Sequence, residues 1–152
     1  MDHKKINCLP LLVVLFFILP AAQSQEKGDE PPNDPNIKLA GQLAEKIMDG
    51  MKSGNIYLLN EQQATPATVK GLNRQTQLAV YKQISDEFGE YKHLTFVESI
   101  PVGEAEPYMM YRFRGTFSKA KQGPEIRVVI SDDRKLAGFW IIPWKDEIGG
   151  NP

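Results

Sequence analysis

Residues 125–144 read EIRVVISDDRKLAGFWIIPW, and this stretch decides the fold. Residues 125–131 and 136–142 are rich in β-branched and aromatic side chains, and residues 132–134 between them have the composition of a tight turn. A short connection forces its two strands to run antiparallel, because a parallel return needs a crossover of a dozen or more residues. The sequence therefore predicts an antiparallel hairpin.

The register of this hairpin depends on the length of its turn. A two-residue turn at Asp133-Arg134 sets Arg127 opposite Trp140, whereas a three-residue turn shifts the pairing by one and breaks it. In the first register Arg127 can stack on Trp140, a cation–π contact worth about 0.5–2 kcal/mol. Pro143 places this strand at an edge or ends it there, because proline cannot donate to a ladder. The sequence does not decide between these two registers.

Two further stretches have the period-two pattern of strands. Residues 93–100 and 108–117 are rich in β-branched and aromatic residues. The turn residues PVG at 101–103 and QGP at 122–124 separate the predicted strands. Short connections throughout predict a four-stranded antiparallel meander.

The chain before these strands has helical periodicity. Asp34-Pro35 is a typical helix start, with a carboxylate for the free backbone amides and a proline at the first helical position. Gly54 is a suitable end. Apolar residues recur between them at spacings of three and four: Ile37, Ala40, Ala44, Ile47 and Met51.

A second helical region follows. Thr65-Pro66 and Asn73 are both start signals, so the region is either one kinked helix or a short turn followed by a longer helix. The longer part, residues 74–88, has one face formed by Thr76, Val80, Ile84 and Phe88, and Gly89 ends it. Helices followed by strands predict an α+β fold.

The amino end has the order of a secretory signal peptide. Lys4 and Lys5 precede an apolar run at 9–19, and the small residues Ala22 and Ser24 suit cleavage before Gln25. The run is about half the ~20 residues that span a bilayer, so we expect no membrane association after cleavage. The sequence predicts export to a periplasmic or extracellular location.

The domain organisation follows from this signal. We expect a signal peptide at 1–24, a flexible leader at 25–33, a single α+β domain at 34–145 and a C-terminal tail at 146–152. The only cysteine, Cys8, lies within the predicted signal peptide, so the mature domain has no disulfide or cysteine chemistry. A formal net charge of −1 gives no basic footprint for nucleic acid.

Two helices, the corner FGEY at 88–91 and the hairpin at 125–144 together resemble the nuclear transport factor 2-like superfamily, the cystatin-like α+β roll. They look like its small exported domains, which occur alone or ahead of secreted hydrolases. The resemblance implies N-terminal helices packed in a bent four-stranded antiparallel meander, with a cone-shaped cavity as the default ligand site. The alternative is a single helix layer on a flat antiparallel sheet, like small secreted inhibitor domains.

Residues for proton transfer are few. His93 begins the first predicted strand and by strict alternation lies on its polar face, whereas Glu98 shares the apolar face with Phe96. These two are the weak catalytic candidates, because a base on this scaffold needs burial to tune its pKa. We expect no metal site and no cofactor, since one imidazole is too few for zinc and no nucleotide-binding motif is present.

Cationic and aromatic residues form the candidate binding group. The simple interpretation is a sheet surface on which the arginines lie along apolar neighbours and keep their charged ends in water. The more specific interpretation is that these residues form a binding surface, because Arg, Tyr and Trp are enriched at interaction hot spots. The candidates are Tyr108, Arg112, Arg114, Arg127, Trp140 and Trp144.

Three functions remain open from the sequence. The leading hypothesis is a non-catalytic exported domain that binds a small molecule or a protein partner in or on its curved sheet, with a homodimer as one form. The second is a small lyase or isomerase that uses His93 or Glu98 in the cavity. The third is an accessory domain or inhibitor of a secreted hydrolase.

Overall fold

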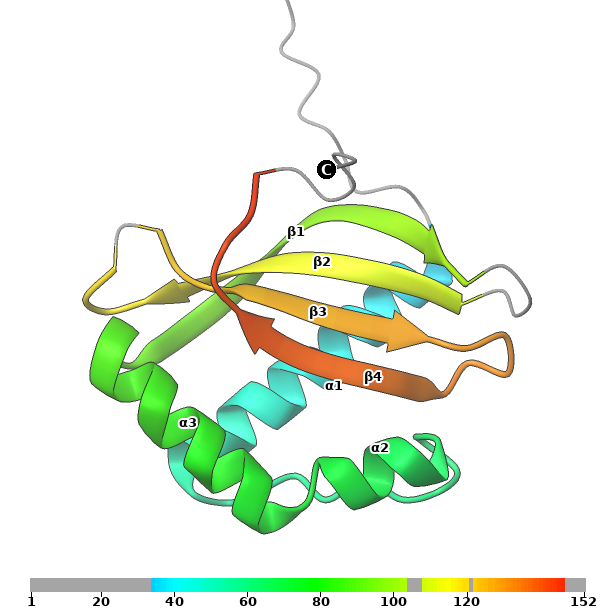
Figure 1. Ribbon diagram of the computed structural model, residues 1–152, viewed down its shortest axis with the longest axis horizontal. Helices are drawn as coiled ribbons and strands as arrows, with labels where there is room; N and C mark the ends of the chain where they lie inside the picture. The colour runs from blue at the N-terminus through cyan, green and yellow to red at the C-terminus, as the bar shows by residue number, and fades with distance from the viewer. Residues whose placement is uncertain (1–33, 104–107, 121, 147–152) are drawn as a thin grey trace, which may run out of the picture. The chain divides into compact units, whose positions relative to one another are not determined.

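The structure, a computed structural model, describes residues 34–103, 108–120 and 122–146. Three helices precede a four-stranded antiparallel sheet that is not closed into a barrel (Figure 1). The predicted α+β class is therefore confirmed. The predicted signal peptide, the leader and all but the first residue of the predicted tail lie outside the described residues.

Helix α1 covers Pro35–Ser53 and has the ends that the sequence predicts. The Asp34 carboxylate accepts a hydrogen bond from the Asn36 amide at 2.8 Å, which satisfies a free donor of the first turn. Gly54 ends the helix in the left-handed conformation, with φ of 74°. The predicted apolar stripe is buried at every position: Ile37, Ala40, Ala44, Ile47 and Met51.

The second helical region is a short helix followed by a longer one. Helix α2 covers Pro66–Gly71 with Thr65 as its N-cap, and α3 covers Arg74–Phe88 with Asn73 as its N-cap. Both start signals in the sequence are thus used. The side-chain oxygens of the two caps accept from backbone amides three residues further on, which is the usual N-cap geometry.

The sheet has the order of the sequence, β1-β2-β3-β4, with β1 and β4 at its edges. Its strands are β1 (Tyr91–Val102), β2 (Tyr108–Phe117), β3 (Glu125–Ile130) and β4 (Leu136–Ile142). Helix α1 lies behind one face, which we call the inner face, and α2 and α3 lie beside the β4 edge (Figure 1). The opposite face is called the outer face.

One core joins the helices to the inner face. It contains Ile47 and Met48 of α1 together with Phe113 and Val128 of the sheet. Burial of such apolar side chains is the main stabilising contribution, at about 25 cal/mol per Å² of apolar surface. Three polar contacts orient α1 on the strands: the Tyr91 hydroxyl and the Leu94 amide donate to the Glu45 carboxylate, and the Tyr111 hydroxyl donates to Asp34 Oδ2 at 3.1 Å.

A bulge in β1 corrects the predicted placement of Glu98. Phe96 pairs with Phe113 on the inner face, but the register shifts after Phe96 and Glu98 pairs with Arg112. The extra residue, Val97, therefore moves Glu98 to the outer face. The expectation that Glu98 shares a face with Phe96 is wrong, because strict alternation holds only in a strand without a bulge.

The β3–β4 turn settles the register that the sequence left open. The Ser131 amide donates to the Lys135 carbonyl oxygen at 2.9 Å, so the turn has three residues, 132–134. Val129 nevertheless pairs with Gly138 and Arg127 with Trp140, because β4 contains an additional residue, Ala137, between Gly138 and the next paired position. The first predicted pairing is confirmed, although the predicted two-residue turn is not its cause.

Candidate functional site

The chain crosses back over the outer face after β4. We call residues 143–146 the C-terminal strap, which rises across the sheet in Figure 1. Its Trp144 ring lies over two arginines of β2, with ring centroids 5.0 Å from the guanidinium carbon of Arg112 and 3.8 Å from that of Arg114. Arg112 Nη2 also donates to the Lys145 carbonyl oxygen at 2.6 Å. The strap thereby covers the middle of the outer face.

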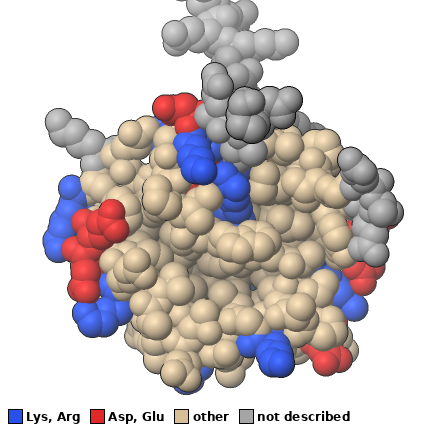
Figure 2. All heavy atoms as spheres, viewed as in Figure 1, with Lys and Arg blue, Asp and Glu red and all other residues tan. Residues whose placement is uncertain are grey.

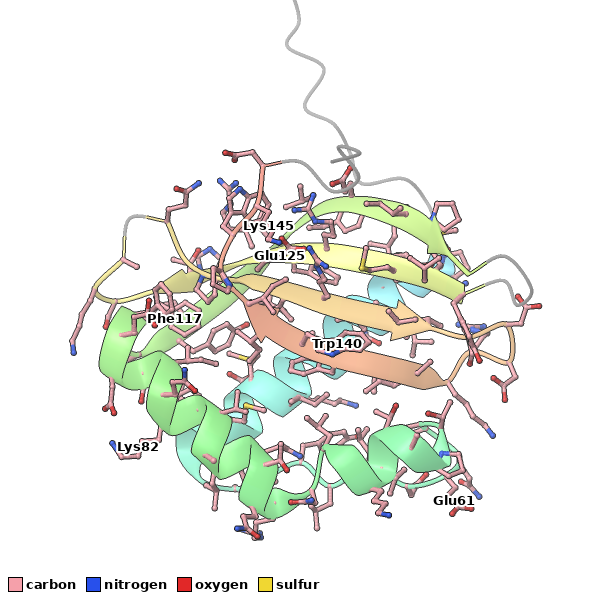
Figure 3. The ribbon with its side chains drawn as sticks, viewed as in Figure 1. Glu61, Lys82, Phe117, Glu125, Trp140 and Lys145 are labelled. Carbon is pink, nitrogen blue, oxygen red and sulfur yellow. The ribbon has the colours of Figure 1, made fainter. Side chains whose placement is uncertain are left out.

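A buried ion cluster lies beneath the strap. The Arg112 guanidinium donates twice to the Glu125 carboxylate, Nε to Oε1 and Nη2 to Oε2, both at 2.8 Å. Its Nη1 binds the Glu98 carboxylate, and Arg127 Nε donates to Glu125 Oε1. The Arg112 and Glu125 side chains are 1% and 0% exposed, so solvent does not reach the central pair. Figure 3 shows Glu125 and Lys145 near each other where the strap crosses.

The pKa values of this pair follow from the contacts. Burial alone raises the pKa of the Glu125 carboxyl, but hydrogen bonds from Arg112 and Arg127 outweigh burial and lower that pKa to about 2. Hydrogen bonds to Glu125 and Glu98 raise the pKa of the Arg112 guanidinium above its usual value, against the effect of burial. Both groups are charged at neutral pH, and the cluster is a structural ion pair.

This arrangement corrects the expected role of the arginines. The charged end of Arg112 is buried, so the expectation that it stays in water is wrong. Arg114 stacks on Trp144, and Arg127 is partly exposed beside Glu125. Among the described contacts there is no stacking of Arg127 on Trp140, because its guanidinium turns to Glu125. Tyr108 pairs with Val102 at the far end of β2.

The two candidates for proton transfer lie away from any enclosed site. His93 is exposed, and its Nε2 lies 3.2 Å from the Thr116 hydroxyl on the neighbouring strand. Glu98 is paired with Arg112, and its side chain is 46% exposed. Within residues 34–103, 108–120 and 122–146, no three His, Cys, Asp or Glu side chains are close enough to hold a metal ion. This geometry does not support the lyase or isomerase hypothesis.

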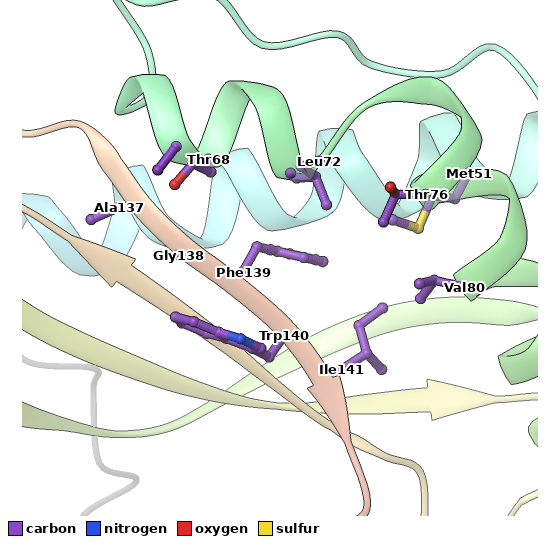
Figure 4. A pocket seen from close by; sticks show the side chains of 12 residues that line it. Met51, Thr68, Leu72, Thr76, Val80, Ala137, Gly138, Phe139, Trp140 and Ile141 are labelled. Atoms are coloured by element: carbon purple, nitrogen blue, oxygen red, sulfur yellow. The ribbon is translucent and has the colours of Figure 1, made fainter.

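An apolar cavity of about 470 Å³ lies between β4 and the helices α2 and α3. We call it the β4 groove, and Figure 4 shows it from close by. Helices α1, α2 and α3 contribute Met51, Ala67, Thr68, Gly71, Thr76 and Val80, the α2–α3 connection contributes Leu72, and β4 contributes Ala137, Gly138, Phe139, Trp140 and Ile141. Its volume is in the range of about 300–1,000 Å³ that is usual for small-molecule sites.

The chemistry of the β4 groove is simple. None of its lining residues is ionisable, and the polar groups among its side chains are the hydroxyls of Thr68 and Thr76 and the indole N–H of Trp140. In Figure 2 an uncharged band crosses this face of the molecule, and the charged residues gather at its margins and near the strap. Trp140 is 50% exposed, although its ring is large and apolar. Such a surface favours uncharged, apolar ligands.

The position of Trp140 depends on a glycine. A Cβ atom at Gly138 would lie 2.0 Å from Cη2 of the Trp140 ring, so the indole occupies the space above Gly138. The absence of a side chain at Gly138 therefore lets the ring lie along the strand and form a wall of the groove.

Trp140 is the one predicted binding residue that lines the β4 groove. Arg112, Arg114 and Trp144 belong to the covered ion cluster instead. Sequence reasoning missed Leu72, Val80, Phe139 and Ile141 as groove residues, since an apolar side chain at a periodic position is equally consistent with the core. Only the placement of α2 and α3 beside β4 distinguishes the two.

Comparisons with protein-family models, with curated proteins and with solved structures find no match to this chain. The resemblance to the nuclear transport factor 2-like superfamily stays a prediction. Among the described helices, none combines the length and the apolar character that a membrane crossing requires.

Proposed function

We propose that this chain is an exported, non-catalytic domain that binds an uncharged, apolar ligand in the β4 groove. The single observation that carries the proposal is the groove itself, an apolar cavity of about 470 Å³ bordered by an exposed tryptophan. An exposed aromatic ring beside an apolar hollow is costly for an isolated domain and is typical of binding sites. The signal-peptide pattern of residues 1–24 supports the exported location.

The distribution of charge supports a binding role over a catalytic one. The strongly interacting charges, those of Arg112 and Glu125, neutralise each other beneath the strap. His93 and Glu98 do not line the groove, and none of its lining residues is ionisable, so no general acid or base of the described residues is positioned beside a bound ligand there. The side chains that a ligand in the groove would meet are mainly apolar, with the hydroxyls of Thr68 and Thr76 and the indole N–H of Trp140 as their polar groups.

The fluorescence of N-phenyl-1-naphthylamine, a neutral apolar probe, tests the proposal. We expect saturable binding to the wild-type protein and a loss of about tenfold or more in affinity in Thr76→Trp, since the indole would fill the groove from α3. Gln75→Trp is the matched control, because Gln75 is the exposed preceding residue of the same helix and does not line the groove. Equal binding by both variants, or no saturable binding by the wild type, would contradict the proposal.

A further inference from the structure

The β4 groove follows the free edge of a strand. Five consecutive residues, 137–141, line it. Successive side chains of a strand point to opposite faces, so one cavity can touch all five only where it runs along the main-chain edge. β4 is the last strand of the sheet, and an edge strand presents N–H and C=O groups that are not used by its one neighbour.

The chain itself already pairs with the beginning of this edge. Ala64 forms a parallel bridge with Leu136: the Thr65 amide donates to the Leu136 carbonyl oxygen at 3.0 Å, and the Leu136 amide donates to the Gln63 carbonyl oxygen at 2.9 Å. Pro66 follows and begins α2, so the chain turns into a helix directly after Thr65. The intramolecular pairing therefore stops where the groove begins.

We infer that an extended peptide segment of a partner protein adds to β4 as a fifth strand, continuing the pairing that residues 63–65 begin. The inference rests on the proposed function and names the class of ligand. An apolar groove alone suits many small molecules, but a groove along an open strand edge suits a ligand with its own regularly spaced N–H and C=O groups. A peptide main chain supplies them, as in other cases of strand addition.

The groove also defines the chemistry of the peptide. At 3.2–3.4 Å per residue, the edge from Ala137 to Ile141 accommodates about five residues in extended conformation. Alternate side chains of such a peptide would point toward Leu72 and Val80, where the lining is apolar and uncharged, so they should be apolar. The other side chains would point toward the outer face, beside the Trp140 ring. β-branched and aromatic residues are expected, because they favour extended chains.

Selection from a displayed library of random octapeptides, followed by synthesis of the enriched sequences, tests the inference. We expect the synthetic peptides to bind the wild-type protein and Gln75→Trp equally, and Thr76→Trp at least about tenfold more weakly. Only alternate residues of a paired strand exchange hydrogen bonds with the neighbour. N-methylation of one alternate set of peptide residues should therefore abolish binding, while N-methylation of the other set should leave it nearly unchanged.

Three results would overturn the inference. The first is that no sequence is enriched on the wild-type protein over Thr76→Trp. The second is that both N-methylated sets bind equally, since recognition would then use side chains alone. The third is a homodimer that protects the amides of residues 138–142 from hydrogen exchange, because a second copy would then occupy the edge. If N-phenyl-1-naphthylamine still binds in the groove when peptides fail, the proposed function stands and only the peptide inference is lost.

Discussion

Glu125 lies directly opposite Arg114 on the neighbouring strand, but it gives both carboxylate oxygens to Arg112, its diagonal neighbour. Arg114 instead stacks on Trp144 of the C-terminal strap. The diagonal pairing leaves the two arginines side by side under one indole ring. Packing of the strap and formation of the ion pair are thus parts of one arrangement.

The ion pair predicts a large effect of removing one partner. Arg112→Met should lower the free energy of unfolding by roughly 3–5 kcal/mol, because the carboxylate of Glu125 stays buried with fewer donors. The double variant Arg112→Met/Glu125→Leu should lose less of its free energy of unfolding, since apolar side chains can replace a buried ion pair at small cost. Urea unfolding measures both. A double variant that is less stable than Arg112→Met would contradict this account.

The lowered pKa of Glu125 predicts acid sensitivity. Its pKa of about 2 in the folded protein lies below the ordinary value of 4.5, so its contribution to stability is complete above about pH 4.5 and is lost as pH falls toward 2. A difference of this size corresponds to on the order of 3 kcal/mol. Thermal unfolding between pH 6 and pH 2 measures it. Glu125→Gln is the control, and its melting temperature should fall less across this range; an equally steep fall would assign the acid sensitivity to other groups.

The packing of Trp140 over Gly138 predicts a difference between two Gly→Ala variants. Gly138→Ala should displace the indole, because its Cβ would lie 2.0 Å from the ring, whereas a Cβ at Gly71 meets nothing within 4 Å. Both glycines line the groove. N-phenyl-1-naphthylamine should bind Gly138→Ala roughly fivefold more weakly, because about 1 kcal/mol of aromatic contact is lost. Gly71→Ala adds a methyl group but displaces no side chain, so it should weaken binding less.

Tryptophan emission provides an independent measurement of the same change. In a Trp144→Phe background Trp140 is the only tryptophan of the chain. Gly138→Ala should then shift its emission as the ring moves, and Gly71→Ala should not. Identical spectra for the two variants would show that the ring does not depend on Gly138.

Asp34 joins the start of α1 to the sheet, which predicts a coupled effect. Asp34→Ala should lower the free energy of unfolding by about 2–3 kcal/mol, because it removes the N-cap and leaves the buried Tyr111 hydroxyl without its acceptor. In a Tyr111→Phe background the same substitution should cost only about 1 kcal/mol, the value of the cap. A double-mutant cycle by urea unfolding measures the coupling, and additive losses would show that the hydroxyl contact contributes nothing.

The sequence predicts the elements because their signals are local. The caps at Asp34 and Asn73, the end at Gly54 and the period-two pattern around Tyr111 each depend on residues that are neighbours along the chain. These features are fixed by backbone geometry and by local hydrogen bonds. They hold whatever the elements later pack against.

The faces of the strands follow from the sequence only where the ladder is regular. Val97 and Ala137 are extra residues in β1 and β4, and no composition signal distinguishes them from ordinary strand residues. The first moves Glu98 to the outer face, and the second restores the Arg127–Trp140 pairing after a three-residue turn. A bulge is set by the pairing of two strands, so one strand alone cannot show it.

By itself the sequence determined an α+β chain of helices followed by an antiparallel meander, and it predicted Trp140 as one of six candidate binding residues. The tertiary structure alone decided that Arg112 is covered by the strap and that α2 and α3 leave a groove beside β4. The physical reason is the distance along the chain between the residues that interact. Helix caps and strand periodicity arise from neighbours in sequence, whereas burial of a charge and the opening of a cavity depend on segments that are distant along the chain and meet only in the folded domain.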